Sequence, residues 1–257
     1  MGRIIAITNQ KGGVGKTTTA INLSACVAQR GYRTLLIDMD PQGNATSGLG
    51  QAGKGERSIY DVLIEHAPLG ETVVDTGYFG LALVPSHINL AGAEIELVDM
   101  QRREGRLRDA LDAVRDDYDY LFLDCPPSLS LLTINALTAA DGMLIPIQCE
   151  YFALEGVGQL MNTLSLVRKR LNIALEVEGI VLTMLDTRTN LGTQVAEEVR
   201  KHFGERVFSA AIPRNVRLSE APSYGLPIEL YDPRCPGAAA YRELAEALCE
   251  RGGAGHA

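Results

Sequence analysis

A glycine-rich segment near the amino terminus constrains the fold of this 257-residue chain more than any other stretch. It reads Q-K-G-G-V-G-K-T-T at residues 10–18 and follows the apolar run of residues 3–8. A β-branched run, a glycine-rich turn and a helix-like continuation together form the context of a phosphate-binding loop. Glycines, which have no Cβ atom, let successive backbone N–H groups converge on one anion at the start of a helix. We therefore predict that this segment binds the phosphates of a nucleotide, rather than forming a glycine-rich hairpin.

The side chains of the loop have distinct predicted roles. Lys16 adds a positive charge to the β and γ phosphates, and the Thr17 hydroxyl is placed to bind Mg²⁺. The predicted nucleotide-binding residues of the loop are Lys11, Gly12, Gly13, Val14, Gly15, Lys16, Thr17 and Thr18.

The loop departs from the ordinary G-x-x-x-x-G-K-[ST] motif in one informative way. Its first glycine is replaced by Gln10, and a second lysine, Lys11, follows. A lysine at this point lies too far round the loop to grip its own nucleotide easily, but it could reach the phosphates of a second subunit. The pattern resembles the deviant Walker A loop of the family that includes the ParA/Soj partition ATPases, MinD and the nitrogenase iron protein. This resemblance implies that Lys11 acts in trans as a catalytic residue and that ATP lies between two subunits.

Two aspartates end the next predicted strand, residues 33–38. Asp38 and Asp40 are spaced by two, so an extended backbone puts both on one side, at the carboxyl edge of a parallel sheet where ligands bind. Asp40 is also explained by turn formation, because Asp-Pro followed by Gln-Gly-Asn is favourable turn chemistry. The D-x-D-P-Q-G-N stretch resembles the first switch region of ParA/Soj proteins. The resemblance assigns to Asp40 the attacking water and, less directly, to Asp38 the outer shell of the metal.

A second acidic strand end occurs at residues 118–124. Four apolar residues followed by Asp124 are typical of a Walker B strand, whose terminal carboxylate holds Mg²⁺, usually through water. The following Pro-Pro-Ser resembles the second switch of the same family.

The base and DNA contacts are predicted from the carboxyl-terminal half. No N-K-x-D tetrad for guanine occurs, which favours ATP over GTP. Residues 213–222 closely resemble a ParA/Soj decapeptide, which implies that Pro213 and Asn215 contact adenine. Arg188 and Arg217 fall where Soj-like proteins have DNA-contacting arginines, although a surface ion pair explains either arginine equally well. Since the net charge is −8, any DNA contact must be local.

Alternating strand and helix patterns indicate an α/β class: a mainly parallel twisted sheet with helices on both faces, as in P-loop NTPases. One domain is expected over residues 1–250, with a flexible tail at residues 251–257. The predicted strands are residues 3–8, 33–38, 81–85, 118–124, 142–148, 177–185 and 207–212. The predicted helices are residues 16–30, 58–66, 102–117, 129–140, 153–171 and 237–249.

Five cysteines without C-x-x-C spacing predict reduced, buried thiols rather than disulfides or a metal site. We expect no signal peptide and no membrane span.

The resemblance to the chromosomal Soj/ParA branch extends from residue 4 to about residue 248. It implies an ATP-dependent homodimer that binds double-stranded DNA non-specifically in the cytoplasm, on the nucleoid, and is released when a ParB/Spo0J-type protein stimulates hydrolysis. The alternatives are a MinD-like membrane-cycling regulator, for which the tail is too short and too weakly basic an anchor, and a nucleotide-gated scaffold without turnover.

Overall fold

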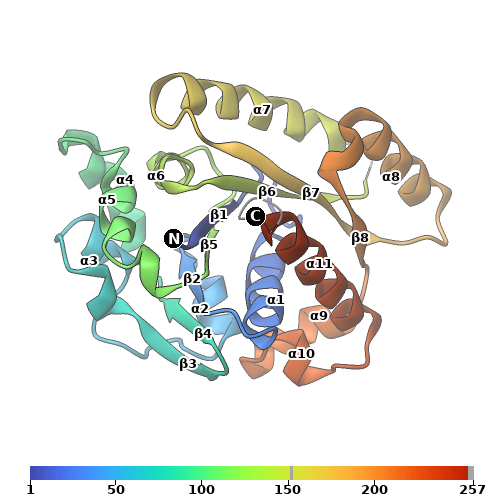
Figure 1. Ribbon diagram of the computed structural model, residues 1–257, viewed down its shortest axis with the longest axis horizontal. Helices are drawn as coiled ribbons and strands as arrows, with labels where there is room; N and C mark the ends of the chain where they lie inside the picture. The colour runs from blue at the N-terminus through green and yellow to red at the C-terminus, as the bar shows by residue number, and fades with distance from the viewer. Residues whose placement is uncertain (151–152, 254–257) are drawn as a thin grey trace.

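The computed structural model describes residues 1–150 and 153–253, and its described strands form one eight-stranded sheet (Figure 1). The strand order is β3-β4-β2-β5-β1-β6-β7-β8. Their bounds are β1 (Arg3–Ile7), β2 (Thr34–Asp38), β3 (Val74–Tyr78), β4 (Leu81–Val84), β5 (Tyr120–Asp124), β6 (Gly142–Gln148), β7 (Glu176–Leu185) and β8 (Val207–Pro213).

Every neighbouring pair in the sheet is parallel except β3 with β4. The register sets Ile7 beside Asp124 and Asp124 beside Asp38, so β1, β5 and β2 end at the same level. The predicted α/β class with a mainly parallel sheet is confirmed, and so are all seven predicted strands. The loops that carry the predicted site therefore leave the same edge of the sheet.

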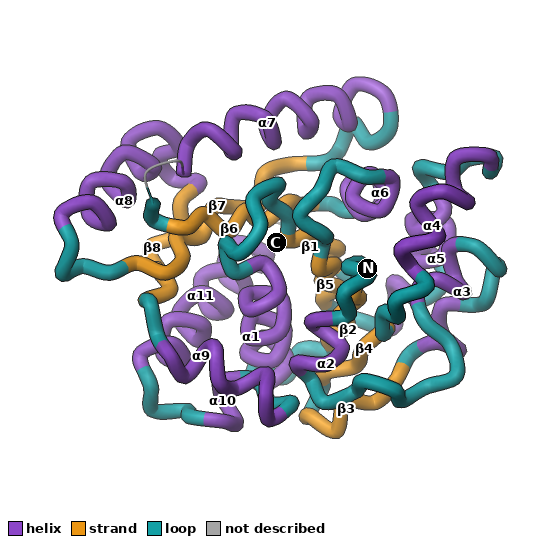
Figure 2. Tube along the Cα trace, turned by 180° about the vertical axis from the view of Figure 1, so that it is seen from behind, coloured by secondary structure: helices purple, strands orange, loops and turns teal. Residues whose placement is uncertain are grey.

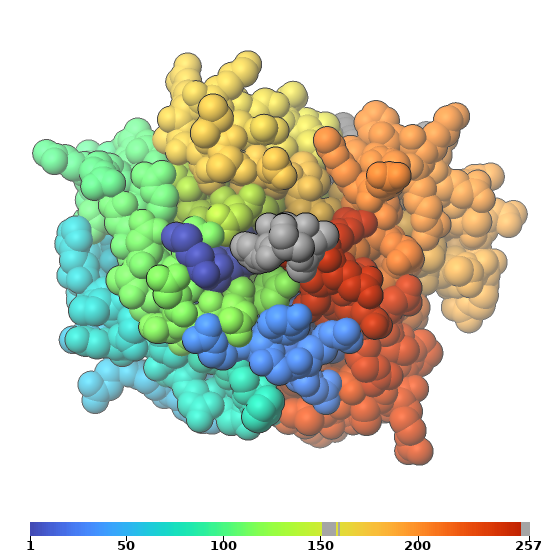
Figure 3. Space-filling view, in the orientation of Figure 1, coloured from blue at the N-terminus to red at the C-terminus, as the bar shows by residue number. Residues whose placement is uncertain are grey.

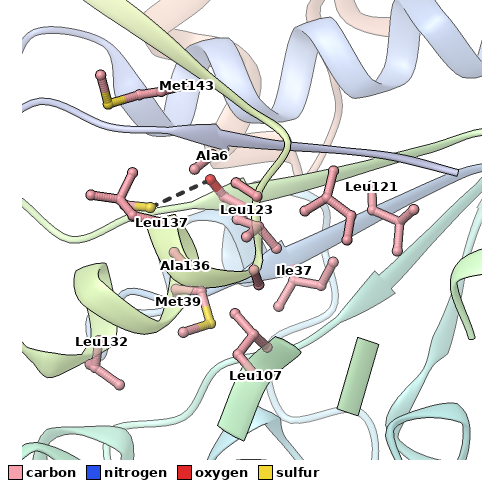
Figure 4. Packing of buried hydrophobic residues seen from close by; sticks show 14 of the residues in the cluster. Ala6, Ile37, Met39, Leu107, Leu121, Leu123, Leu132, Ala136, Leu137 and Met143 are labelled. Atoms are coloured by element: carbon pink, nitrogen blue, oxygen red, sulfur yellow. Dashed lines mark hydrogen bonds between the residues drawn. The ribbon is translucent and has the colours of Figure 1, made fainter. Parts of the chain in front are cut away.

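Helices cover both faces, and alternate strand residues point to one layer or the other. In β1, Ile4 and Ala6 belong to the core beneath the layer from α3 to α8, whereas Ile5 and Ile7 belong to the core beneath α1 and α11. Figure 1 shows α6 and α7 on one side of the sheet and α1 and α11 on the other. Figure 4 shows part of the first core, where sheet residues such as Leu123 face α5 and α6.

The α-helices of the described ranges have the following bounds: α1 (Lys16–Gln29), α2 (Asn44–Gly48), α3 (Ile59–Leu63), α4 (Leu90–Glu96), α5 (Arg106–Asp112), α6 (Leu131–Ala139), α7 (Ala153–Arg170), α8 (Asn190–Phe203), α9 (Val216–Glu220), α10 (Ile228–Tyr231) and α11 (Pro236–Gly253). Short 3₁₀ turns are η1 (Leu69–Thr72), η2 (Leu97–Asp99), η3 (Arg115–Asp117), η4 (Gly204–Arg206) and η5 (Ala221–Tyr224). None of the helices in the described ranges has an apolar stretch long enough to cross a bilayer.

Several elements differ from the prediction. The helix predicted over residues 102–117 is wrong in extent, because the helix begins only after Gly105 and breaks at residue 113 before η3. The edge strand β3 and the helices α4 and α8 were not predicted. All five cysteines are free and buried, as predicted.

The tail predicted from residue 251 is wrong over its first three residues, which continue helix α11. Arg251 donates hydrogen bonds to the carbonyl oxygens of Glu178 (3.3 Å) and Glu205 (3.0 Å), and its guanidinium lies 3.9 Å from the centre of the Phe208 ring. Residues 254–257 lie outside the described residues. Figure 3 shows the amino-terminal residues (dark blue) and the end of α11 (dark red) on the same face of the molecule.

Candidate nucleotide-binding site

The predicted phosphate loop joins β1 to α1 and is shaped by two left-handed glycines. Gly13 has φ 75° and Gly15 has φ 87°, a backbone region that residues with a Cβ rarely occupy. Gly15 also forms the amino cap of α1. Gly12 differs, because its φ is not positive and an added Cβ would meet no atom of the described chain within 4 Å. The sequence context of strand, glycine turn and helix is thus present, and the loop opens at the amino end of a 14-residue helix.

Thr183 of β7, which nothing in its local sequence singles out, anchors the phosphate loop to the sheet. Its buried hydroxyl donates a 2.8 Å hydrogen bond to the Val14 carbonyl. The carbonyl and the N–H of a trans peptide point in opposite directions, so this bond turns the Gly15 N–H away from β7. Asn9 adds a second fixed point, since its amide donates to the Pro146 carbonyl (2.7 Å) and accepts from the Lys11 N–H (3.1 Å).

Lys16 extends back over the loop. Its ammonium donates to the Lys11 carbonyl at 3.2 Å, and the residue is only 6% exposed. Burial lowers the pKa of the Lys16 ammonium, while the nearby charges of Asp124 and Asp40 act in the opposite direction. Lys16 therefore lies near Asp124 and Asp40, two of the three aspartates predicted for the site.

Asp124 is fully buried, and neither of its carboxylate oxygens has a hydrogen-bond partner among the described residues. Burial raises the pKa of Asp124 well above its usual value, and the charge of Asp38 raises it further. A buried carboxylate without donors is costly unless a cation or a proton balances it. The Thr17 hydroxyl is near enough to Asp124 to lower this pKa, although it makes no hydrogen bond of normal geometry with the carboxylate. The pair therefore fits Mg²⁺ held by one carboxylate, one hydroxyl and phosphate oxygens. In the described ranges no group of three His, Cys, Asp or Glu residues could hold a metal alone.

Asp38 is engaged differently. It accepts hydrogen bonds from the Thr46 hydroxyl (2.7 Å), the Thr46 N–H (2.8 Å) and the Asp40 N–H (3.1 Å). Burial raises the pKa of Asp38 to about 6, and these donors oppose the rise. Asp38 thus fastens the segment that carries Asp40, and the contacts with Thr46 were not foreseen.

Asp40 lies in a tight turn and is only 7% exposed. One carboxylate oxygen, Oδ1, accepts the Gln42 N–H at 2.9 Å, which is the turn contact that its Asp-Pro sequence favours. Its carbonyl accepts the Ser86 hydroxyl at 2.7 Å. Within the described part of the chain, the other carboxylate oxygen, Oδ2, accepts no hydrogen bond.

A cavity of about 280 Å³ extends from the phosphate loop toward the carboxyl-terminal half. Its lining includes Gly15 and Thr18 together with Pro213 and Asn215. The Asn215 side-chain oxygen caps α9 by accepting the Arg217 N–H at 2.8 Å, which leaves its NH₂ group for a ligand. Met184, also in the lining, has a left-handed φ of 51°, an uncommon conformation that is often found at functional sites.

Lys11 does not reach into its own loop. Its ammonium lies 3.6 Å from the Glu150 carboxylate, which also lies 3.8 Å from the Arg214 guanidinium. The Lys11 and Glu150 side chains are 37% and 47% exposed, so this ion pair is weak and easily exchanged.

The two arginines predicted to bind DNA are both paired with carboxylates of the same chain. Arg188 makes a two-pronged contact with Asp186 (2.8 and 2.7 Å), and its side chain is 86% exposed. Arg217 contacts Glu220 at 2.9 Å and Asp232 at 3.5 Å. Their DNA contacts stay a prediction.

Figure 2 shows the molecule from behind, with α7 on one side of the sheet and α1 and α11 on the other. Residues 2–177 match the AAA domain family model. The chain is 59% identical over 253 residues to the sporulation initiation inhibitor protein Soj of Bacillus subtilis, covering 98% of this chain and 100% of that protein. It is 54% identical to the chromosome partitioning protein ParA of Caulobacter vibrioides, covering 97% of this chain and 94% of that protein.

Solved structures of other proteins have a similar fold over nearly the whole chain. The cobyrinic acid a,c-diamide synthase of Mycobacterium smegmatis with bound ADP and magnesium is similar with a TM-score of 0.87 and 38% identity, over 99% of this chain and 97% of that one. The cell division ATPase MinD of Pyrococcus furiosus is similar with a TM-score of 0.81 and 26% identity, over 98% of this chain and 99% of that one. With matches over nearly its whole length, the chain belongs to the Soj/ParA family of chromosome-partitioning ATPases.

Proposed function

We propose that this protein hydrolyses ATP with Mg²⁺ and uses the nucleotide state to control a dimer that binds DNA. The observation that carries the proposal is the buried carboxylate of Asp124, unpartnered in the described chain, beside Lys16 at the opening of the phosphate loop. A negative charge placed there with a lysine and a helix amino terminus suits a metal-bound triphosphate. The chromosome-partitioning relatives support the same activity.

Different residues are proposed to bind the phosphates, hold the metal and orient the attacking water. Loop N–H groups and Lys16 bind the phosphates, and Asp124 and Thr17 would hold Mg²⁺, which neutralises charge on the terminal phosphates. Asp38 is proposed in an indirect role, in which it positions the segment 40–46 rather than contacting the nucleotide. The free carboxylate oxygen of Asp40 orients the attacking water, while its other oxygen keeps the turn in place.

The dimer switch depends on Lys11. Its weak pairing with Glu150 leaves the ammonium available to the γ phosphate of a second subunit. Charge neutralisation across a dry interface makes the dimer depend on that phosphate, so hydrolysis separates the subunits.

DNA binding is proposed to follow from dimerisation. Arg188 and Arg217 would exchange their carboxylate partners for DNA phosphates, and a dimer doubles these contacts. A ParB/Spo0J-type protein is the proposed activator of hydrolysis. Because the dimer is proposed to bind DNA, the proposed location is the cytoplasm, on the nucleoid. Pro213 and Asn215, which line the same cavity as Gly15 and Thr18, are the proposed adenine contacts.

Two substitutions test the assignment by separating binding from turnover. Lys16→Ala should weaken ATP binding at least tenfold in calorimetry, whereas Asp40→Ala should keep ATP affinity within about threefold and lose at least 100-fold in turnover. An Asp75→Ala variant, altered at an exposed aspartate of β3, is the control and should match the unmodified protein. Normal turnover by Asp40→Ala would remove Asp40 from the chemistry. Unchanged ATP affinity of Lys16→Ala would refute the loop assignment.

A further inference from the structure

One buried hydroxyl, that of Thr46, lies where two neighbouring strands end. Thr46 belongs to the short helix α2 and is only 2% exposed. Figures 1 and 2 both show α2 beside β2 and β4. These strands pair in parallel with Ile37 beside Val84, so the chain leaves both of them at the same edge of the sheet. The Thr46 side chain can therefore contact the segments that follow both strands.

The Thr46 hydroxyl acts as a donor and as an acceptor at the same time. It donates to Asp38 Oδ2 at 2.7 Å and accepts the Ser86 N–H at 2.9 Å. A hydroxyl has one hydrogen and two lone pairs, so both bonds can form together. Asp38 and Ser86 are buried as well. Removal of the hydroxyl would therefore take a partner from two buried polar groups, each of which is costly to leave unpaired.

Asp38 and Ser86 both hold the backbone of Asp40. Asp38 Oδ1 accepts the Asp40 N–H at 3.1 Å, and the Ser86 hydroxyl donates to the Asp40 carbonyl at 2.7 Å. The peptide groups before and after the Asp40 Cα are thus fixed, one through Asp38 and the other through Ser86. Because Thr46 binds both of these residues, its hydroxyl is the point at which the two restraints meet.

The same contacts separate the roles of two neighbouring carboxylates. Asp38 lies beside Asp124 in the register of β2 and β5. Asp38 accepts three hydrogen bonds, two of them from the Thr46 hydroxyl and N–H, whereas neither oxygen of Asp124 has a partner among the described residues. A carboxylate with most of its acceptor sites occupied is held in place and is less available to a metal. Thr46 thus favours Asp124 as the metal ligand and Asp38 as an anchor.

We propose that Thr46 is a positioning residue for hydrolysis, whose hydroxyl holds Asp38 and the Ser86 segment so that the free oxygen of Asp40 faces the attacking water. This inference rests on the proposed function and deepens it. Thr46 acts through Asp38 and Asp40 rather than by touching the reacting atoms. A displacement of a reacting group by about 1 Å can lower a rate by about 100-fold, so a buried hydroxyl at this point can control turnover.

The test compares Thr46→Val, which keeps the shape and removes the hydroxyl, with Thr46→Ser, which keeps the hydroxyl. Thr46→Val should bind a non-hydrolysable ATP analogue within about threefold of the unmodified protein and lose about 20-fold or more in turnover. Thr46→Ser should restore turnover to within about threefold. The matched control is Thr72→Val, at another 2% exposed threonine, whose hydroxyl donates to the Leu69 carbonyl at 2.7 Å. The control should turn over ATP as the unmodified protein does.

Hydrogen exchange of the nucleotide-free protein gives a readout that does not depend on activity. The Asp40 and Thr46 amides, which both donate to Asp38, should exchange about fivefold faster or more in Thr46→Val, and at the unmodified rate in Thr46→Ser and Thr72→Val. Thr46→Ala, which places no methyl group against the Asp38 carboxylate, is a second variant and should behave as Thr46→Val does.

Three results would overturn the positioning role. These are normal turnover by Thr46→Val and Thr46→Ala, equal losses of turnover and of nucleotide affinity, or unchanged exchange of the two amides. Absence of ATP turnover in the unmodified protein would instead refute the proposed function itself. The two failures are therefore distinguishable, because only the second appears before any residue is changed.

Discussion

Thr183 fixes the direction of one peptide group in the phosphate loop. Its hydroxyl occupies the Val14 carbonyl, so the Gly15 N–H in the same peptide points away from β7. Without that hydroxyl, the Val14 carbonyl is left buried without a donor, at a cost of about 1–3 kcal/mol, or it turns toward the phosphates and repels them.

We predict that Thr183→Val, which keeps the shape and removes the hydroxyl, weakens ADP binding about tenfold while leaving adenosine binding unchanged. Thr183→Ser should restore ADP affinity. Calorimetry with both ligands is the measurement. The control is Thr138→Val, another buried threonine whose hydroxyl donates to a backbone carbonyl, that of Ile134. Equal losses for ADP and adenosine would mean that Thr183 only supports the cavity wall.

Glu178 is predicted to make the stability of the fold depend on pH, independently of the nucleotide-binding site. It is buried in β7 and pairs with Arg3 at 2.6 Å, yet burial raises its pKa more than Arg3 lowers it. The folded state then holds the proton to higher pH than the unfolded state does, so this group's contribution to stability falls as pH rises from about 4.3 through the folded pKa. Glu178→Gln should therefore gain stability relative to the unmodified protein as the pH rises from 4 to 7. Thermal melts should show this gain, and Glu176→Gln, at an exposed position of the same strand, should not.

At the scale of elements, the end of α11 is a structural contact. Arg251 links α11 to the carbonyls of Glu178 and Glu205 and covers the Phe208 ring. Cation–π contacts contribute about 0.5–2 kcal/mol and each hydrogen bond about 0.5–1.5 kcal/mol.

We predict that a chain ending at Glu250 loses about 2 kcal/mol and melts about 4–8 °C lower than the full chain. A chain ending at Gly253, which keeps every described contact of Arg251, should melt with the full-length protein. Equal melting of the two shortened chains would show that Arg251 does not stabilise the fold.

The elements that could be predicted are those whose signal is local. The loop between β1 and α1 has its glycines and lysines within nine residues, and Asp124 follows directly from its apolar strand. The edge strand β3 was missed because it is half exposed, is interrupted by the left-handed Gly77 and pairs with an irregular register. Helix α8 had a usable signal that was overlooked, since Thr189 caps it and apolar residues recur along one side.

Contacts between distant segments could not be predicted from the sequence. Thr183 lies 169 residues from Val14, and Ser86 lies 46 residues from Asp40. Each of these side chains is an ordinary strand or loop residue by its local pattern, and its role depends on which strands become neighbours. In the folded sheet β4 lies beside β2, and only β6 separates β1 from β7. This strand order brings Ser86 to Asp40 and Thr183 to Val14, and the local sequence does not reveal it.

At the scale of the whole molecule, Gly12 provides a test of the proposed second subunit. Its own chain would accept a side chain there, because an added Cβ meets no described atom within 4 Å and φ is not positive. Gly12→Val should therefore bind ATP within about threefold of the unmodified protein and yet stay monomeric. Gly158→Val, at a glycine of α7 that is equally open, is the control and should dimerise. An ATP-dependent dimer of Gly12→Val would indicate that the loops of two subunits do not meet.

The central claim is that the γ phosphate joins two chains through Lys11. The most direct measurement is the solution mass, by light scattering, of the unmodified protein and of Lys11→Ala with a non-hydrolysable ATP analogue, with ADP and without nucleotide. The account predicts two chains per particle only for the unmodified protein with the analogue, and one chain in every other sample. A single chain in all samples, or a Lys11→Ala dimer as stable as the unmodified one, would contradict it.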